Sequence, residues 1–182
     1  MNNLLNEEKL LAIFEQLNSC LVSSNTKIDI IVYGGAMMAL LFNNRPSTSD
    51  IDCRFNSDKI DVRVLENIRQ QFSLTNDWLN QDVKEPISFL KKETIDVFKE
   101  YSNLRILKPS LEQLLAMKIL ASRVEPAKDF VDAYILCKSL CIEKKEQLLK
   151  IVYDYVPEKY IGERQHIFIR YLGEDLGFND WK

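Results

Sequence analysis

The sequence predicts an α+β protein, with a small mixed β-sheet flanked by helices and followed by a C-terminal helical subdomain. Short β-branched runs alternate with amphipathic segments as far as residue 107, and only helical patterns follow Pro109. The chain has 182 residues, 46% of them hydrophobic, which is enough for a substantial core. We therefore expect a core of residues 1–107 and a helical subdomain of residues 108–182 packed on it.

The first elements follow from capping and β-branched residues. Asn6 is suited to cap a helix whose apolar positions recur at helical spacing: Leu10, Leu11, Phe14 and Leu17. The run KIDIIVYGG, residues 27–35, indicates a strand that two glycines end, and AMMALLF indicates a short helix after it. A polar turn, residues 43–49, then leads into a second strand, residues 50–55.

The remainder of the core is predicted from shorter signals. Residues 61–73 have one apolar helical face, whereas TNDWLNQDVKEP after them is predicted to be irregular or briefly helical. Residues 94–98 and 104–107 are short β-type runs. Together these segments predict a small sheet with helices on it.

Capping signals mark the helical subdomain. Ser110 followed by Gln113 fits a capping box, and Pro126 suits the first turn of the next helix. The four helices are expected in LEQLLAMKILASR, AKDFVDAYILCKSL, EKKEQLLKIVYDYV and PEKYIGERQHIFIRYL.

Composition excludes several classes of protein. The net charge of −3 and the pI near 5.3 argue against broad, sequence-independent binding to nucleic acid. No apolar run reaches the length of a membrane span, and the N-terminus lacks a signal-peptide pattern, so we expect a cytoplasmic protein. The four cysteines form no CxxC pair, which indicates free thiols, and Cys137 and Cys141 are spaced to face the core.

Two acids one residue apart are the strongest functional signal. In a strand, Asp50 and Asp52 point to the same face, while Ile51 and Cys53 point into the core. Like charges this close repel each other unless a cation lies between them. Mg²⁺ (or Mn²⁺) suits such a pair, because it binds one or two carboxylates together with substrate phosphates. An Asp-x-Asp alone is also an ordinary solvated pair at a strand end.

The two glycines before the short helix suggest an anion site. Gly34 and Gly35 let a ligand approach the backbone, and the N–H groups at a helix start favour a phosphate. A lone Gly-Gly is more often a turn. The succession of strand, glycines, short helix, turn and acid pair favours phosphate and metal binding over these separate explanations.

This succession resembles the nucleotidyltransferase superfamily. More narrowly, GGAMMALLFNNRPSTSDID, DWLNQDVKE and LKPSLEQLLAMKILASR together resemble a bacterial family of uncharacterised nucleotidyltransferases related to the AbiEii abortive-infection toxin. The resemblance covers roughly residues 28–140 and implies the nucleotidyltransferase type of fold.

The resemblance also implies roles for later residues. Lys118 would contact nucleotide phosphates, and Asp129 would position that lysine or assist catalysis; taken alone, they are a snorkelling lysine and a surface acid. Arg123, Lys128, Asp129 and Asp132 match an Arg-x4-Arg-Asp-x2-Asp pattern in which Lys128 replaces the second arginine and loses its bidentate fork.

Phosphate contacts are implied at three positions in the turn before the acid pair: Arg45, Ser47 and Thr48. A third catalytic acid is expected on a later strand. Asp96 is our candidate, with Asp82 and Glu85 as alternatives.

The function that these features predict is a Mg²⁺-dependent nucleotidyltransferase. It would move a nucleoside monophosphate from an NTP to a hydroxyl of tRNA, a protein or a small molecule. The alternative is a non-catalytic member of the fold that binds nucleotide or a partner, as an antitoxin or sensor does. A toxin with an antitoxin partner is a third hypothesis.

Overall fold

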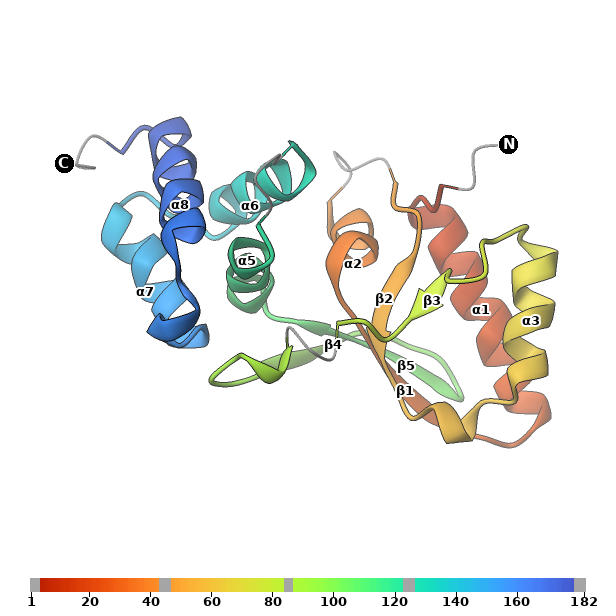
Figure 1. The fold of residues 1–182 in the computed structure, drawn as a ribbon. Coiled ribbons are helices and arrows are strands. Elements are labelled where there is room, and N and C mark those ends of the chain that lie inside the picture. The colour runs from red at the N-terminus through yellow and green to blue at the C-terminus, as the bar shows by residue number, and fades with distance from the viewer. Residues whose placement is uncertain (1–3, 43–46, 84–86, 123–126, 179–182) are drawn as a thin grey trace. The chain divides into compact units, whose positions relative to one another are not determined.

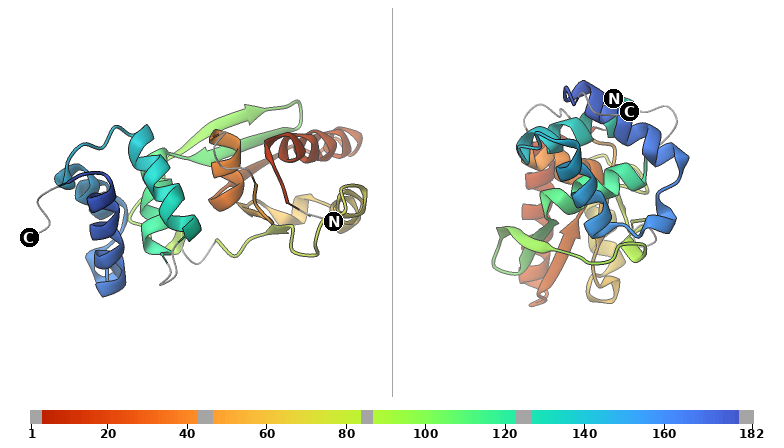
Figure 2. Two further views of the ribbon diagram at one scale, coloured as in Figure 1. Left: turned by 90° about the horizontal axis from the view of Figure 1, so that it is seen from above. Right: turned by 90° about the vertical axis from the view of Figure 1, so that its left-hand side faces the viewer.

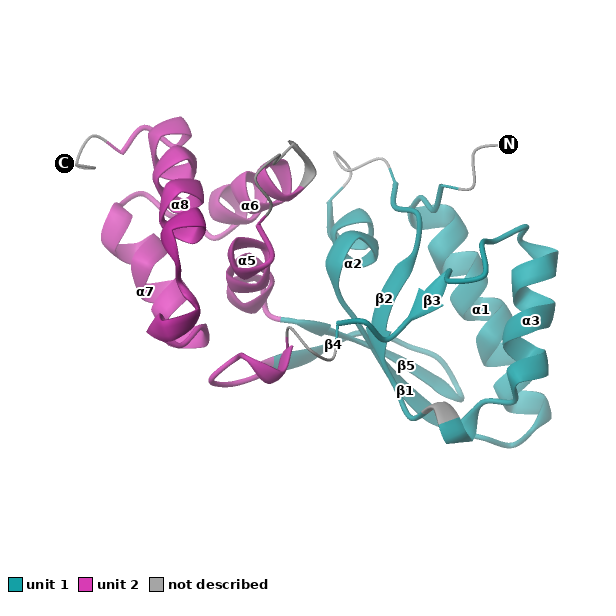
Figure 3. Ribbon diagram, viewed as in Figure 1, with its two compact units in different colours: residues 1–84, 95–109 teal, residues 85–94, 110–182 magenta. Residues whose placement is uncertain are grey.

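The computed structural model describes residues 4–42, 47–83, 87–122 and 127–178. It confirms the predicted α+β class, with a mixed sheet, flanking helices and further helices towards the C-terminus (Figure 1). The chain divides into two compact units (Figure 3). Met1–Lys84 and Ile95–Pro109 form the first unit, and Glu85–Thr94 and Ser110–Lys182 form the second. Residues 85–94 thus belong with the helices after Pro109, although they lie between two strands in the sequence.

The sheet of the first unit has five strands in the order β3-β2-β1-β5-β4. The central strand β1 (Ile28–Val32) is antiparallel to β2 (Ile51–Arg54) and parallel to β5 (Leu104–Pro109). At the edges, β3 (Leu79–Asn80) is parallel to β2 and β4 (Ile95–Glu100) is antiparallel to β5. The strand β3 corrects our prediction of an irregular or helical segment there.

The two faces of this sheet differ in chemistry. Register pairs Val32 with Cys53 and Ile30 with Ile106, and these side chains are fully buried. The alternate residues lie on the opposite face, which we call the charged face, because it carries Asp29, Asp52, Arg54 and Arg105. The acid pair predicted from the sequence therefore belongs to a face that is not hydrocarbon core.

Helices of the first unit fix the buried face. Asn6 caps α1 (Glu7–Ser23) by accepting the Lys9 N–H at 2.9 Å, as predicted. This helix packs against α2 (Gly34–Leu41), α3 (Val62–Gln71) and β5, and Figure 2 shows it alongside the sheet. The short 3₁₀ helix η1 (Ser57–Lys59) lies between β2 and α3.

The second unit is built around one apolar helix. The helix α5 (Leu111–Leu120) packs against α6 (Ala127–Ser139), α7 (Lys145–Tyr155) and α8 (Glu163–Asp175). Another 3₁₀ turn, η2 (Glu158–Tyr160), precedes α8. This arrangement agrees with the helices predicted after Pro109.

The cap of α5 is only half of the predicted capping box. Ser110 Oγ accepts the Gln113 N–H at 3.2 Å. The side chain of Gln113 does not return this bond but accepts the Thr94 N–H at 2.6 Å. Tyr155 O–H also donates to Thr94 Oγ1 at 3.0 Å. These bonds attach the segment before β4 to the helices of the second unit.

All four cysteines are free, as predicted. Cys53 and Cys137 are buried, and Cys20 is half-buried. Our prediction that Cys141 faces the core is wrong, because α6 ends at Ser139 and Cys141 lies in a turn with φ of 52°, exposed to solvent.

None of the helices in the described parts of the chain is both long and apolar enough to cross a bilayer.

Candidate functional site

The carboxylate of Asp52 lies directly against the backbone of Gly34. A Cβ atom built on Gly34 would overlap Asp52 Oδ2, and it would stand 3.4 Å from Asp52 Cγ and 3.5 Å from its Cβ. Gly34 also has φ of +55°, a conformation that other L-residues rarely adopt. The Tyr33 N–H donates to the Asp52 carbonyl at 2.8 Å and locks the two strand ends together. Glycine is therefore required at 34 for two independent reasons.

We had expected helix α2 to begin after these glycines. It begins at Gly34 instead. Its N-cap residue is Tyr33, whose side chain does not cap the helix start. The first intrahelical bond runs from the Met37 N–H to the Tyr33 carbonyl at 3.2 Å. The N–H groups of Gly34, Gly35 and Ala36 thus precede the helical ladder, at the end of the helix dipole that favours anions.

Asp50 is held beside this point by neutral donors. Its Oδ1 accepts from Ser49 Oγ at 3.1 Å and from Thr48 Oγ1 at 3.4 Å. Its Oδ2 accepts from Asn80 Nδ2 at 3.4 Å. Asp50 forms no ion pair with any residue that the structure describes. The described partners of this carboxylate orient it and are all neutral.

Asn80 shows that the two acids face the same place. It is the register partner of Asp52 in β3, and its side chain reaches Asp50. Since paired residues of parallel strands share a face, both carboxylates lie on the Asn80 side of the sheet. The sequence did not single out Asn80, because a two-residue strand has no periodicity to detect.

The chain before the acid pair is anchored by the N-terminus. Leu5, whose side chain is fully buried, forms an antiparallel bridge with Thr48. The Leu5 N–H donates to the Thr48 carbonyl at 2.7 Å, and the Thr48 N–H donates back at 2.9 Å. Ser47 and Thr48, the two predicted phosphate contacts that the structure describes, precede the pair directly in the sequence. Thr48 is buried and Ser47 is half-buried. Arg45 lies outside the described residues.

The donor chemistry of the pair fits a divalent cation. Carboxylate oxygens are hard ligands, and Mg²⁺ needs only one or two of them when a nucleotide supplies further oxygens. No group of three His, Cys, Asp or Glu side chains suited to hold a metal exists among the residues described. The pair thus fits a metal that arrives with phosphate ligands better than a cation held by protein alone.

Asp96 is not brought to the pair. It lies on the edge strand β4, and β5 and β1 separate that strand from β2 by about 14 Å. Register pairs Asp96 with Lys108, which is on the buried-face side of β5, and Asp96 Oδ2 lies 3.8 Å from Lys108 Nζ. Among the alternatives, Asp82 is exposed and donates its N–H to Asn80 Oδ1 at 3.1 Å, and Glu85 lies outside the described residues.

Lys118 forms a buried charge cluster within the second unit. Its Nζ lies 3.0 Å from Asp129 Oδ1 and 2.7 Å from Asp132 Oδ2. The side chains of Lys118 and Asp132 are only 12% and 2% exposed. The predicted contact between Lys118 and Asp129 therefore exists, and α5 and α6 each supply part of the cluster.

Asp132 is the member of this cluster for which no role was predicted from the sequence. It lies three residues after Asp129, so both point to the same side of α6. That spacing was a usable signal. The side chain of Lys128 and the whole of Arg123 lie outside the described residues.

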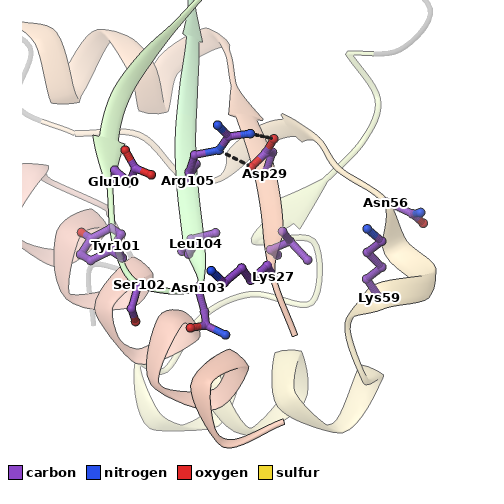
Figure 4. A pocket seen from close by; sticks show the side chains of 11 residues that line it. Lys27, Asp29, Asn56, Lys59, Glu100, Tyr101, Ser102, Asn103, Leu104 and Arg105 are labelled. Carbon is purple, nitrogen blue, oxygen red and sulfur yellow. Dashed lines mark hydrogen bonds and ion pairs between the residues drawn. The ribbon is translucent and has the colours of Figure 1, made fainter. Parts of the chain in front are cut away.

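A separate hollow of about 540 Å³ lies in the first unit, at the start of β1 (Figure 4). Figure 4 shows Arg105 turned toward Asp29, with Nε and Nη2 2.8 and 2.5 Å from its carboxylate oxygens. The hydrogen bond from Arg105 lowers the pKa of Asp29 below its usual value. None of the site residues that the sequence predicted lines this hollow.

Comparison with known proteins gives one family. A family model described as a nucleotidyltransferase of unknown function (DUF6036) matches residues 8–171. No curated protein and no solved structure gives a significant match.

Proposed function

The chain belongs to this family, described as nucleotidyltransferases of unknown function (DUF6036), and we propose that it transfers a nucleoside monophosphate from a nucleoside triphosphate to an acceptor hydroxyl. The observation that carries the proposal is the contact between Asp52 and Gly34 at the start of α2. It puts a carboxylate beside backbone N–H groups, so a metal ligand and a phosphate cradle adjoin each other.

In this proposal, Asp50 and Asp52 bind Mg²⁺ or Mn²⁺ together with the triphosphate. When bound, the cation offsets the charge of the phosphate oxygens and of the leaving pyrophosphate. The N–H groups of Gly34 and Gly35 donate to phosphate oxygens, with Ser47 and Arg45 as further donors. Thr48 and Ser49 also keep Asp50 turned in one direction.

The reaction is an in-line displacement at the α-phosphorus. The acceptor oxygen forms a new bond to this phosphorus, and the bond to the bridging oxygen of pyrophosphate breaks, with its electron pair leaving on pyrophosphate. The hydroxyl proton passes to solvent. The contribution of the chain is to position the reactants and to preorganise charge around them.

Lys118 is proposed to donate to a nucleotide phosphate. Two of its three ammonium protons face Asp129 and Asp132, and the third has no acceptor among the residues described. Asp129 then has the role of orienting the lysine.

Binding experiments test the proposal directly. We expect triphosphate binding, measured by calorimetry, to require Mg²⁺ or Mn²⁺ and to vanish in Asp50→Ala/Asp52→Ala. Asp29→Ala is the matched control, because Asp29 is an acid on the same face of the same sheet and is 44% exposed. Loss of binding in the control, or binding by the double variant, would contradict the proposed site.

The non-catalytic alternative is favoured by one observation, the lack of a third acid at the pair among the described residues. It predicts triphosphate binding that does not depend on metal, and no pyrophosphate release with any acceptor. Pyrophosphate release from radiolabelled triphosphates in the presence of tRNA or protein fractions separates the two functions.

A role as a toxin with an antitoxin partner is proposed on the resemblance to the AbiEii toxin alone. Its test is growth after induced expression. We expect arrest with the natural sequence and normal growth with Asp50→Ala/Asp52→Ala. Equal growth of both strains would remove this role and leave the transferase proposal unaffected.

A further inference from the structure

Asn80 occupies the position on β3 that is closest to both acids. Its Cα is the register partner of Asp52, and its Nδ2 lies 3.4 Å from Asp50 Oδ2. It is therefore tied to both members of the pair, to Asp52 by strand register and to Asp50 by a hydrogen bond.

The orientation of the Asn80 amide follows from its surroundings. Its Oδ1 accepts the Asp82 N–H at 3.1 Å, and an amide oxygen cannot donate. The NH₂ end must then face Asp50, where it meets an acceptor. The backbone is fixed as well, since the Asn80 carbonyl accepts from Cys53 Sγ at 3.4 Å.

Asp50 is therefore a carboxylate that its neighbours orient, and the described donors to it are all neutral. An ionised carboxylate accepts at about four lone-pair sites, and Thr48, Ser49 and Asn80 use three of them. A carboxylate at position 80 would instead add a third negative charge within a few ångströms of Asp50. The amide thus holds the acid without adding a negative charge beside it.

We propose that Asn80 is a positioning residue of the acid pair. Its N–H orients Asp50 for a divalent cation. The metal-binding part of this proposal rests on the proposed function. The contact between Asn80 and Asp50 is independent of that function.

The first test measures Mn²⁺ binding to the full chain. Binding is monitored as the loss of the free Mn²⁺ signal in electron paramagnetic resonance. Asn80→Ala is expected to weaken binding about tenfold or more, the loss of one hydrogen bond to a charged group. Asn56→Ala is the matched control. Like Asn80, Asn56 accepts through Oδ1 the backbone N–H of the residue two positions later, here Asp58, at 3.1 Å. Unlike Asn80, its amide bonds to no carboxylate among the described residues. Equal losses in the two variants, or none in Asn80→Ala, would overturn the proposal.

A double-mutant cycle separates positioning from a general effect on the fold. Because Asn80 acts through Asp50, Asn80→Ala should change Mn²⁺ affinity less than twofold when Asp50→Ala is already present. An undiminished effect in that background would show that Asn80 does not act through Asp50.

The contact itself is tested without metal, by thermal unfolding. Asn80→Asp should lower Tm by repulsion, and adding Asp50→Asn should recover at least half of the loss, since donor and acceptor are then exchanged. Recovery together with no Mn²⁺ binding by the natural chain would sink the metal site and the proposed function but keep the contact. Failure of recovery would sink the contact, whatever the protein binds.

Discussion

Gly34 shows how the lack of one side chain shapes the candidate site. Its φ of +55° disfavours any other residue, and the Asp52 carboxylate fills the space where a Cβ would be. The sequence suggested glycine here for close approach by a ligand. The structure shows that the side chain closest to Gly34 is that of Asp52, one of the two proposed metal ligands.

Gly34→Ala is expected to weaken metal-dependent triphosphate binding. The added methyl displaces Asp52 from the start of α2, so affinity should fall by at least about tenfold, equivalent to 1.4 kcal/mol. The positive φ should also cost about 1–2 kcal/mol of stability. Calorimetry and thermal unfolding measure the two effects separately.

Gly177→Ala is the control for backbone strain. Gly177 has φ of +84°, and a Cβ there would meet nothing within 4 Å. This variant should lose comparable stability and keep triphosphate affinity. If it lost affinity as well, the effect at Gly34 would reflect instability rather than a displaced carboxylate.

The cysteines should differ sharply in reactivity. Burial raises the pKa of the Cys137 thiol to about 12, so almost no reactive thiolate exists at pH 8. With Ellman's reagent at that pH, we expect the exposed Cys141 to react fast, and Cys53 and Cys137 to react only in denaturant. Cys141→Ser should remove the fast phase. A fast phase that persists in this variant would contradict the assignment.

Two short extended pieces of chain hold Asp50, and neither could be predicted. The bridge from Leu5 to Thr48 involves one residue on each side, and β3 has two residues. Secondary-structure signals depend on periodicity over longer windows, which such pieces lack. By contrast, the caps of α1 and α5 were predicted, because Asn6 and Ser110 act within three residues of themselves.

The contact between α5 and α6 should depend more on Asp132 than on Asp129. Both bind Lys118, but Asp132 is 2% exposed and Asp129 is 26% exposed. Asp132→Ala leaves a buried ammonium group short of a partner and should cost about 3–5 kcal/mol. Asp129→Ala should cost about 1 kcal/mol, since water replaces part of its contact. Urea unfolding measures both, and the reverse order would refute the buried cluster.

The two compact units each hold one part of the proposed machinery. The acid pair and Gly34 belong to the first unit, and Lys118 with its two carboxylates belongs to the second. The proposed role of Lys118 requires both parts to respond to the same nucleotide. The resemblance, and not the geometry of either unit, is the reason to connect them.

Hydrogen exchange tests this connection over the full chain. With Mg²⁺ and a non-hydrolysable triphosphate, we expect slower exchange at the start of α2 and around β2, and also in α5 and α6. Asp29→Ala should show the same pattern. Protection confined to the first unit would leave the acid pair as a nucleotide site and remove Lys118 from it.

Local patterns in the sequence were enough to predict the α+β class, most helices, four of the five strands that the structure describes and an acid pair beside glycines. Each of these depends on neighbours a few residues away, through periodicity, capping or alternation. Long-range pairing decided the rest. It brings Asn80 to Asp50, 30 residues apart in the sequence. It also puts Asp96 on an edge strand away from the acid pair, and it groups residues 85–94 with the helical unit. Such contacts depend on which strands become neighbours and on which face each residue lies, and no short stretch of chain encodes that order.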